Sequence, residues 1–157
     1  MVDESTFLQE VQAMERTLYR VSRSLLPAWT DCADAVQEAL RKAWEKRGRV
    51  EPNYFRPWLT RIVVNECRNI QRLRRRVIPV AEFSREPSFP PPDPSLKEAI
   101  SALPEKLRLP LLLHYLEGFS VDEVARMLHL PSGTVKWRLS KARESLREKW
   151  TTEEVQG

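Results

Sequence analysis

The sequence predicts an all-α protein built from two small helical domains, and three observations support this. Apolar residues recur three and four positions apart, the period of an amphipathic helix, whereas the strict alternation typical of strands is missing. Hydrophobic residues make up 41% of the chain and charged residues 31%, a balance typical of folded proteins. Six of the twelve prolines lie between residues 77 and 95 and separate the helical patterns into two groups.

The proline-rich segment 77–94 is predicted to be a linker. Proline has no amide hydrogen and a fixed φ, so such a segment forms neither a helix nor a central strand and stays extended. The expected organisation is a domain at 1–76, the linker, a second domain at 95–150 and a tail at 151–157.

The first predicted helix covers residues 6–26 and ends before Pro27, which cannot continue a helix. Its apolar residues form one stripe, as expected for a helix with one buried face. They are Phe7, Val11, Met14, Leu18, Val21 and Leu25.

The second and third predicted helices cover residues 30–48 and 57–76. Thr30 and Asp31 are capping candidates for the second helix, which ends at a glycine. Pro57 is a favourable first-turn residue for the third helix. The expected core positions of the two helices are Val36, Leu40, Ala43, Leu59, Ile62, Val63, Cys67, Ile70 and Leu73.

Four shorter helices are predicted after the linker, over residues 95–103, 105–118, 120–130 and 132–147. Pro110 is expected to kink or delay the second of these, because it removes one backbone hydrogen bond. Ser120 and Glu123 have the spacing of a capping box at the start of the third. Pro131 precedes the fourth, and Ser132 is the expected capping residue at its start.

The last two predicted helices have the layout of a helix-turn-helix, whose second helix enters the major groove of DNA. Helical periodicity places Val135, Leu139, Ala142 and Leu146 on the core face of this second helix. The opposite face carries Lys136, Trp137, Ser140 and Lys141. Trp137 is therefore expected to be exposed or to meet DNA, and the alternative is an indole that lies over the stem of Lys141. The free amides at Ser132, Gly133 and Thr134 favour a phosphate.

The net charge of +4 is unevenly distributed along the chain. Basic residues concentrate at 68–76 and at 131–149, where six Lys or Arg face only Glu144 and Glu148. Two basic patches on separate segments indicate a polyanion that is contacted twice. The alternative is a pair of solvated helix faces.

Nothing in the sequence indicates a catalytic, metal or cofactor site. Cys67 falls on a core stripe, Cys32 has no ligand-like neighbour, and His114 and His129 stand alone, so we expect these residues to be structural or solvent-facing. Carboxylates such as Glu38 lack a convergent His, Cys or phosphate loop. We therefore expect no enzyme and no cofactor. With no signal peptide and no apolar run long enough to span a membrane, we expect a soluble, cytoplasmic protein without membrane insertion.

Three motifs carry a resemblance to a known family. "DAVQEALRKAW", "WLTRIVVNECRN" and the segment "ALPEKLRLPLLLHYLEGFSVDEVARMLHLPSGTVKWRLSKARESLR" occur in this order and span most of the chain. They resemble the sigma-two and sigma-four domains of extracytoplasmic-function (ECF) sigma factors of bacterial RNA polymerase. The resemblance implies a transcription initiation factor made of a sigma-two-like bundle of three or four helices and a sigma-four-like helix-turn-helix bundle. Its implied partners are RNA polymerase core, through the clamp coiled coil of the largest subunit and the flap, and promoter DNA, with an anti-sigma protein as a candidate regulator.

The resemblance also implies roles for individual residues. Polymerase docking would fall on Asp34, Gln37 and Glu38. A pocket for a base flipped out of the melted minus-ten strand, with neighbouring backbone contacts, would comprise Arg47, Arg49, Tyr54, Asn65, Arg68, Asn69 and Arg72. Reading of the minus-35 duplex would fall on Ser132, Thr134, Lys136, Trp137, Arg138, Ser140, Lys141 and Arg143.

Two sites depart from the family pattern, a pair of adjacent residues and a single residue. Leu40-Arg41 stands where Phe-Leu is common, which bears on packing or polymerase contact. Trp137 stands where a small serine is common, and a large apolar group favours thymine methyl groups over hydrogen-bonded base edges. The alternative function is a stand-alone helix-turn-helix regulator, which would need a dimerisation surface or a ligand pocket that the first three helices do not clearly show.

Overall fold

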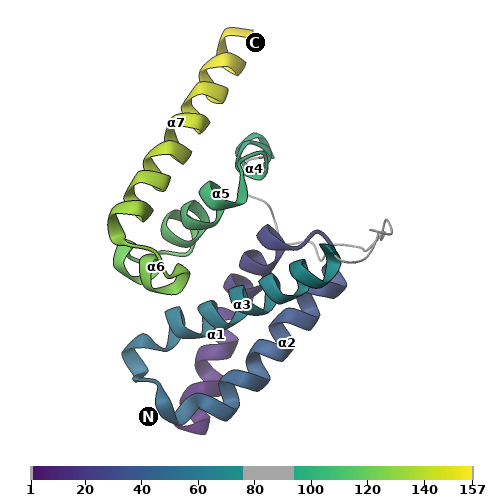
Figure 1. The fold of residues 1–157 in the computed structure, drawn as a ribbon, viewed down its shortest axis with the longest axis vertical. Coiled ribbons are helices and arrows are strands. Elements are labelled where there is room, and N and C mark those ends of the chain that lie inside the picture. The colour runs from purple at the N-terminus through teal and green to yellow at the C-terminus, as the bar shows by residue number, and fades with distance from the viewer. Residues whose placement is uncertain (1, 76–93, 157) are drawn as a thin grey trace. The chain divides into compact units, whose positions relative to one another are not determined.

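The computed structural model describes residues 2–75 and 94–156, and these residues form helices and no strands (Figure 1). The chain divides into two compact units, Met1–Glu86 and Pro87–Gly157. The all-α prediction is confirmed. The predicted linker lies outside the described residues except for Pro94, which begins a helix, and the proposed domain limits stay predictions.

In the N-terminal unit, the described residues 2–75 form a bundle of three helices that all pack on one another. They are α1 (Glu4–Leu25), α2 (Trp29–Lys46) and α3 (Phe55–Arg75), with the 3-10 turns η1 (Arg47–Arg49) and η2 (Pro52–Tyr54) between α2 and α3. Five of the six apolar residues predicted for α1 are buried, and Val11 is half-buried. α2 buries a stripe of alanines, Ala35, Ala39 and Ala43. Small side chains let neighbouring helices approach closely, and the α2–α3 contact is the most extensive in the unit.

The start of α2 differs from the prediction. Its N-cap is Ala28, which makes no side-chain hydrogen bond, so Thr30 and Asp31 lie inside the first turn and are not caps. Asp31 is buried, and its carboxylate instead accepts two hydrogen bonds from Arg74 of α3, at 2.7 and 3.0 Å. A buried carboxylate needs such a partner, and this partner comes from the far end of the unit's sequence.

Three further expectations for α2 and α3 were wrong or only partly met. α3 begins at Phe55, two residues before Pro57, because η2 leads directly into it. Leu40, Ile62 and Ile70 are half-buried, whereas Leu73 is exposed. Leu73 is exposed because the space between α2 and the last turns of α3 is a cavity, which Leu73 and Ile70 line.

The described residues of the C-terminal unit, 94–156, form four α-helices and one π-helical turn. The elements are α4 (Pro94–Ser101), α5 (Glu105–Leu111), the π turn η3 (Leu112–Leu116), α6 (Val121–Leu128) and α7 (Ser132–Gln156). α7 packs on α5 and α6. The core of the unit includes Leu107, Leu109, Leu113, Val124, Met127, Val135, Leu139 and Ala142.

The helix predicted over 105–118 changes type after its proline. Pro110 is buried inside α5, and the π turn begins at Leu112, with the Glu117 amide donating to the Leu112 carbonyl at 3.0 Å. Proline removes one helical hydrogen bond, and a wider turn directly after it is one way to accommodate that loss. The expected effect of Pro110 is therefore present as a change from an α-helix to a π-helical turn.

The turn between α6 and α7 fixes the helix-turn-helix. The predicted capping box is confirmed: Ser120 Oγ accepts from the Glu123 amide at 3.1 Å, and Glu123 Oε1 accepts from the Ser120 amide at 2.9 Å. α6 ends at Leu128, its C-cap His129 has a left-handed φ of 55°, and the Leu130 amide donates to the Ala125 carbonyl at 2.9 Å. This left-handed residue reverses the chain between the two helices.

Ser132 does not cap α7 as expected. The Pro131 carbonyl accepts from the amides of Thr134 and Val135, at 3.0 and 3.2 Å, so Ser132 is already the first helical residue. Its hydroxyl donates to Asp122 of α6 at 2.9 Å. The side chain therefore ties the two helices of the motif together.

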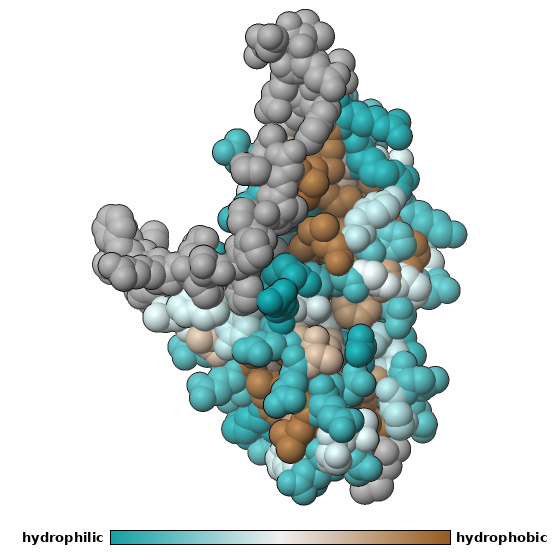
Figure 2. All heavy atoms as spheres, turned by 180° about the vertical axis from the view of Figure 1, so that it is seen from behind, coloured by the Kyte–Doolittle hydropathy of each residue, from teal (hydrophilic) through white to brown (hydrophobic). Residues whose placement is uncertain are grey.

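Figure 2 shows how apolar and hydrophilic side chains are distributed over one face of the molecule. Hydrophilic side chains cover most of the described surface of the N-terminal unit, with small apolar areas among them, whereas apolar side chains gather on the C-terminal unit. The large apolar residues with the most exposed surface are Leu8, Leu73, Tyr115, Leu116 and Trp137.

Alkaline pH is expected to destabilise the N-terminal unit through Cys32. Both cysteines are free and fully buried, and burial raises the pKa of the Cys32 thiol from its ordinary 9.0 to about 11. Because the folded-state pKa is the higher one, the unfolded state loses this proton first, and stability falls as pH rises from about 9 towards 11. We expect Cys32 to account for a loss of about 1 kcal/mol by pH 10, measured by urea unfolding.

Cys32→Ala is the control for this titration. The variant has no thiol at this position, so its stability should fall less steeply between pH 8 and pH 10 than that of the parent chain, by ~1 kcal/mol. An identical pH dependence in the two proteins would show that Cys32 does not contribute.

Candidate functional site

The outward surface of α7, here called the α7 face, carries most of the residues predicted to contact minus-35 DNA. Lys136, Trp137, Ser140, Lys141 and Arg143 are exposed. Val135, Leu139 and Ala142 are buried on the opposite side, and Leu146 is half-buried. Ser132, Thr134 and Arg138 are half-buried at the edges of the face. The predicted division of the helix into a core side and an outward side is confirmed.

Trp137 is the largest side chain of the α7 face, and 57% of its surface is exposed. Lys141 Nζ lies 5.8 Å from the centroid of the indole ring, near the outer limit of a cation–π contact, and 3.3 Å from Glu144 Oε2. The expected exposure of Trp137 is therefore confirmed, and the indole also lies close to the Lys141 ammonium group, whereas its contact with DNA stays a prediction.

Arg143 is held by a residue that the sequence did not indicate. Its guanidinium donates to Tyr115 Oη and lies 5.8 Å from the centroid of that ring. Tyr115 belongs to η3, so the contact links α7 to the π turn. No sequence signal joins two residues that are 28 positions apart.

The α3 face comprises Asn65, Arg68, Asn69 and Arg72, which lie on one side of the helix because they are three and four positions apart. Asn65 and Arg72 are exposed, and Arg68 and Asn69 are half-buried. Arg72 donates to Asn69 Oδ1. The face thus presents one exposed amide beside two guanidinium groups.

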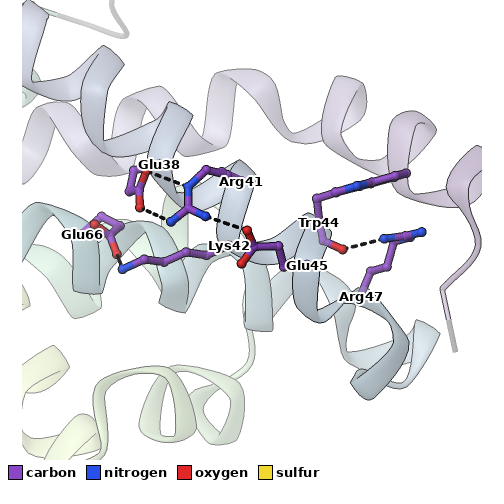
Figure 3. Close-up of polar contacts among 7 residues, drawn as sticks. All are labelled: Glu38, Arg41, Lys42, Trp44, Glu45, Arg47 and Glu66. Atoms are coloured by element: carbon purple, nitrogen blue, oxygen red, sulfur yellow. Dashed lines mark hydrogen bonds and ion pairs between the residues drawn. The ribbon is translucent and has the colours of Figure 1, made fainter.

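The loop residues predicted to complete the minus-ten pocket lie in η1 and η2. Arg49 is exposed and Tyr54 is half-buried. Arg47 stacks on Trp44, with its guanidinium carbon 3.6 Å from the ring centroid, and donates to the Trp44 carbonyl at 2.7 Å (Figure 3). The guanidinium of Arg47 is therefore held by both the ring and the carbonyl of Trp44.

The α2 face comprises Asp34, Gln37, Glu38, Arg41 and Glu45. Arg41 donates to both carboxylate oxygens of Glu38, at 2.6 and 3.1 Å, and to Glu45 at 2.6 Å (Figure 3). These bonds lower the pKa of Glu38 and raise that of Arg41. Arg41, which departs from the family pattern, thus fixes the Glu38 carboxylate. Arg41 lies three positions from Glu38 and four from Glu45, and helical ion pairs have these spacings, so the sequence could have predicted both contacts.

A second charge pair connects α2 with α3. Lys42 Nζ lies 2.5 Å from Glu66 Oε1, and Glu66 is buried (Figure 3). Sequence reasoning missed this pair because its members are 24 positions apart.

The described part of the chain holds neither a metal-binding cluster nor a membrane-spanning helix. Among residues 2–75 and 94–156, no three His, Cys, Asp or Glu side chains come together in a group that could hold a metal ion. None of the described helices is long and apolar enough to cross a membrane.

The chain matches the family profile "Sigma-70 region 2" over residues 11–77 and the profile "Sigma-70, region 4" over residues 94–146. It is 32% identical to the ECF RNA polymerase sigma factor SigM of Mycobacterium tuberculosis, over 92% of this chain and 76% of SigM. The chain belongs to the ECF RNA polymerase sigma factor family. This makes it a transcription initiation factor that directs RNA polymerase to promoters.

Further relatives and solved structures agree. The ECF sigma-E factor of Escherichia coli is 31% identical over 76% of this sigma factor and 73% of its own length. The probable sigma factor RfaY of Xanthomonas campestris is 31% identical over 87% of this chain, which spans only 38% of RfaY. The solved sigma factor RpoE of Bartonella quintana, in complex with the anti-sigma factor NepR, is 28% identical with a TM-score of 0.77, covering 90% of this chain and 94% of that one. CnrH, solved in complex with the cytosolic domain of CnrY, is 26% identical with a TM-score of 0.70, covering 96% of this chain and 90% of CnrH.

The three faces fall inside the matched regions of this sigma factor. The α2 and α3 faces lie within the region 2 match, and the α7 face lies within the region 4 match. The family is one of transcription regulators.

The pKa of Glu38 is expected to report on the Arg41 contact. In Arg41→Ala the carboxylate loses its largest source of stabilisation, so its pKa should rise towards the ordinary 4.5, measured by NMR titration of the side-chain carboxyl carbon. Arg49→Ala, which removes an exposed positive charge that makes no contact with Glu38, is the control and should leave this pKa unchanged. An unchanged pKa in Arg41→Ala would contradict the contact.

Proposed function

We propose that this sigma factor docks on RNA polymerase core through the α2 face and reads promoter DNA through the α3 and α7 faces. The observation that carries the proposal is the α7 face. On the second helix of a helix-turn-helix, Lys136, Trp137 and Lys141 are exposed directly opposite a buried apolar stripe. This arrangement presents basic and aromatic side chains to a major groove while the core holds the helix in place.

Contacts of the α7 face with the minus-35 duplex divide into two kinds. Lys136, Arg138 and Lys141 supply positive charge for phosphates, which gives affinity with little dependence on sequence. Arg143, held by Tyr115, offers its charge from a fixed position on the same helix. Trp137 supplies an exposed apolar surface without charge, suited to thymine methyl groups in the major groove.

The α3 face is proposed to bind the melted minus-ten strand. Asn65 carries an exposed amide that can donate to and accept from the edge of an unstacked base. Arg68 and Arg72 lie on the same side of the helix and suit the adjacent phosphates. Arg47, Arg49 and Tyr54 stay proposed members of this site, and Arg47 would first have to leave Trp44.

Polymerase contact is proposed to involve the clamp coiled coil of the largest subunit at the α2 face and the flap at the C-terminal unit. Asp34, Gln37 and Glu38 give the α2 face hydrogen-bonding and negatively charged groups for a basic partner surface. RpoE and CnrH were solved with the anti-sigma factor NepR and with CnrY, which supports an anti-sigma protein as a second partner. We infer a cytoplasmic, non-enzymatic role, because the proposed partner is the transcribing polymerase.

Charge reversal on the α2 face is expected to abolish core binding. A chain with both Gln37→Lys and Glu38→Lys should lose measurable affinity for core polymerase in a fluorescence binding assay, because like charges facing each other in an interface cost several kcal/mol. A chain with Gln12→Lys and Glu15→Lys, at exposed positions of α1, is the matched control and should bind normally. Wild-type affinity in the first variant, with helicity intact by circular dichroism, would rule out the α2 face as the docking surface.

Trp137 is expected to set base preference and Lys141 to set affinity. Trp137→Ser should leave the salt dependence of holoenzyme binding nearly unchanged and shift preference at one or two minus-35 base pairs by about 1–3 kcal/mol. Lys141→Ala should weaken all sequences similarly and lower the salt slope by about one unit. Both are measured with holoenzyme on minus-35 variants at several salt concentrations.

A packing role for the indole would give a different result. In that case Trp137→Ser would lower the melting temperature of the C-terminal unit without changing base preference. Its 57% exposure argues against this outcome.

A further inference from the structure

The cavity between α2 and α3 has an apolar part and an acidic part. It has a volume of about 390 Å³ and lies entirely within the N-terminal unit. Ile70 and Leu73 of α3 line its apolar part, and Asp34 and Glu38 of α2 are among the carboxylates that line its acidic part. We call this cavity the α2–α3 groove.

Leu73 gives the groove an apolar side chain that the fold does not use. It is 61% exposed, the largest exposed fraction among the large apolar residues of the described chain. Ile70, one turn earlier on α3, is only half-buried. An exposed apolar residue in a hollow is a suitable anchor point for a partner, since its burial would remove apolar surface from water.

Among the described residues, one carboxylate that lines the groove has no cationic partner. Asp31 is paired with Arg74 at 2.7 Å, Glu66 with Lys42 at 2.5 Å, and Glu38 with Arg41 at 2.6 Å. Asp34 is exposed and makes no ion pair with any residue that the structure describes. The groove is therefore complementary to an apolar side chain that lies near a Lys or Arg.

The α2–α3 groove is continuous with the proposed docking face, because Asp34 and Glu38 belong to both. A partner that covers Asp34 and Glu38 on α2 therefore also lies at the edge of the groove. We propose that the groove is a second part of the polymerase-docking surface. It takes an apolar residue of a basic, amphipathic polymerase segment against Ile70 and Leu73, while a Lys or Arg of that segment pairs with Asp34. This inference rests on the proposed docking of core on α2 and extends it to α3.

Substitutions at Leu73 test the apolar part of the groove. Leu73→Gln should weaken the Kd for core polymerase by about 10-fold, because the partner loses an apolar contact and must desolvate an amide. Leu73→Met keeps an apolar side chain of similar volume and should bind within about twofold of wild type. The control is Leu8→Gln, which changes another exposed leucine of the same unit and should also stay within about twofold.

The salt dependence of binding tests the acidic part. Asp34→Asn removes the unpaired charge, so it should weaken binding and make it less dependent on salt. Leu73→Gln removes no charge and should leave the salt dependence unchanged.

Protection from labelling tests the same contact without relying on affinity. Both native cysteines are buried, so Leu73→Cys adds a single accessible thiol to the described chain. Saturating core polymerase should slow its reaction with a maleimide by about 10-fold or more, because a reagent cannot reach a thiol inside an interface. The thiol of Leu8→Cys should react equally fast with and without core.

The outcomes separate this inference from the proposed function. If the variant with Gln37→Lys and Glu38→Lys loses core binding but Leu73→Gln binds normally and Leu73→Cys is not protected, the groove is not part of the interface. If the double variant also binds normally, docking on α2 itself is wrong. Loss of affinity in Leu73→Gln together with protection of Leu73→Cys supports the groove.

Discussion

The N-terminal unit depends on the close packing of α2 against its two neighbours. The alanines at positions 35, 39 and 43 are fully buried, and side chains this small let α3 lie close along α2. α3 contributes larger apolar residues to the same core, such as Leu59, Val63 and Cys67. Because this packing fixes the rotation of both helices, it also determines which residues remain outside. The α2 and α3 faces are what the core leaves exposed.

Charge pairs then modify the surfaces that the core leaves exposed. Asp31 and Glu66 are buried carboxylates, and each receives a cation from the other helix of the α2–α3 pair. Arg41 acts within α2, where it holds Glu38 and Glu45 together on the solvent side. Exposed pairs of this kind contribute little to stability. Their effect is on position and charge, since a carboxylate held by two hydrogen bonds presents a fixed group to a partner.

In the C-terminal unit, a left-handed turn residue and side-chain hydrogen bonds hold α7. The left-handed residue His129 reverses the chain, and Ser132 bonds to Asp122 across the turn. Further along α7, Arg143 donates a hydrogen bond to Tyr115 and so connects the helix to the π turn. These contacts come from three elements and fix α7 at separate points along its length. These contacts hold the helix that carries Trp137 and its basic neighbours.

Local sequence patterns predicted the helices and most of their buried sides. Examples are the apolar stripes that begin at Phe7 and Val135 and the capping box at Ser120. Each consists of residues a few positions apart, and the geometry of the helix backbone relates such residues directly. For the same reason the exposure of Trp137 and Lys141 was predictable. The roles of these residues towards DNA and polymerase stay predictions.

Which distant side chains meet depends on how the helices pack on one another. The pairs Asp31–Arg74, Lys42–Glu66 and Arg143–Tyr115 join residues 43, 24 and 28 positions apart, and no local pattern specifies them. The exposure of Leu73 was decided in the same way. Its place on the apolar stripe of α3 predicted burial, but burial also requires a neighbour, and the packing of α2 leaves a cavity there. Helical periodicity predicts the side of a helix on which a residue lies. The packing of the helices on one another determines whether another side chain covers that residue.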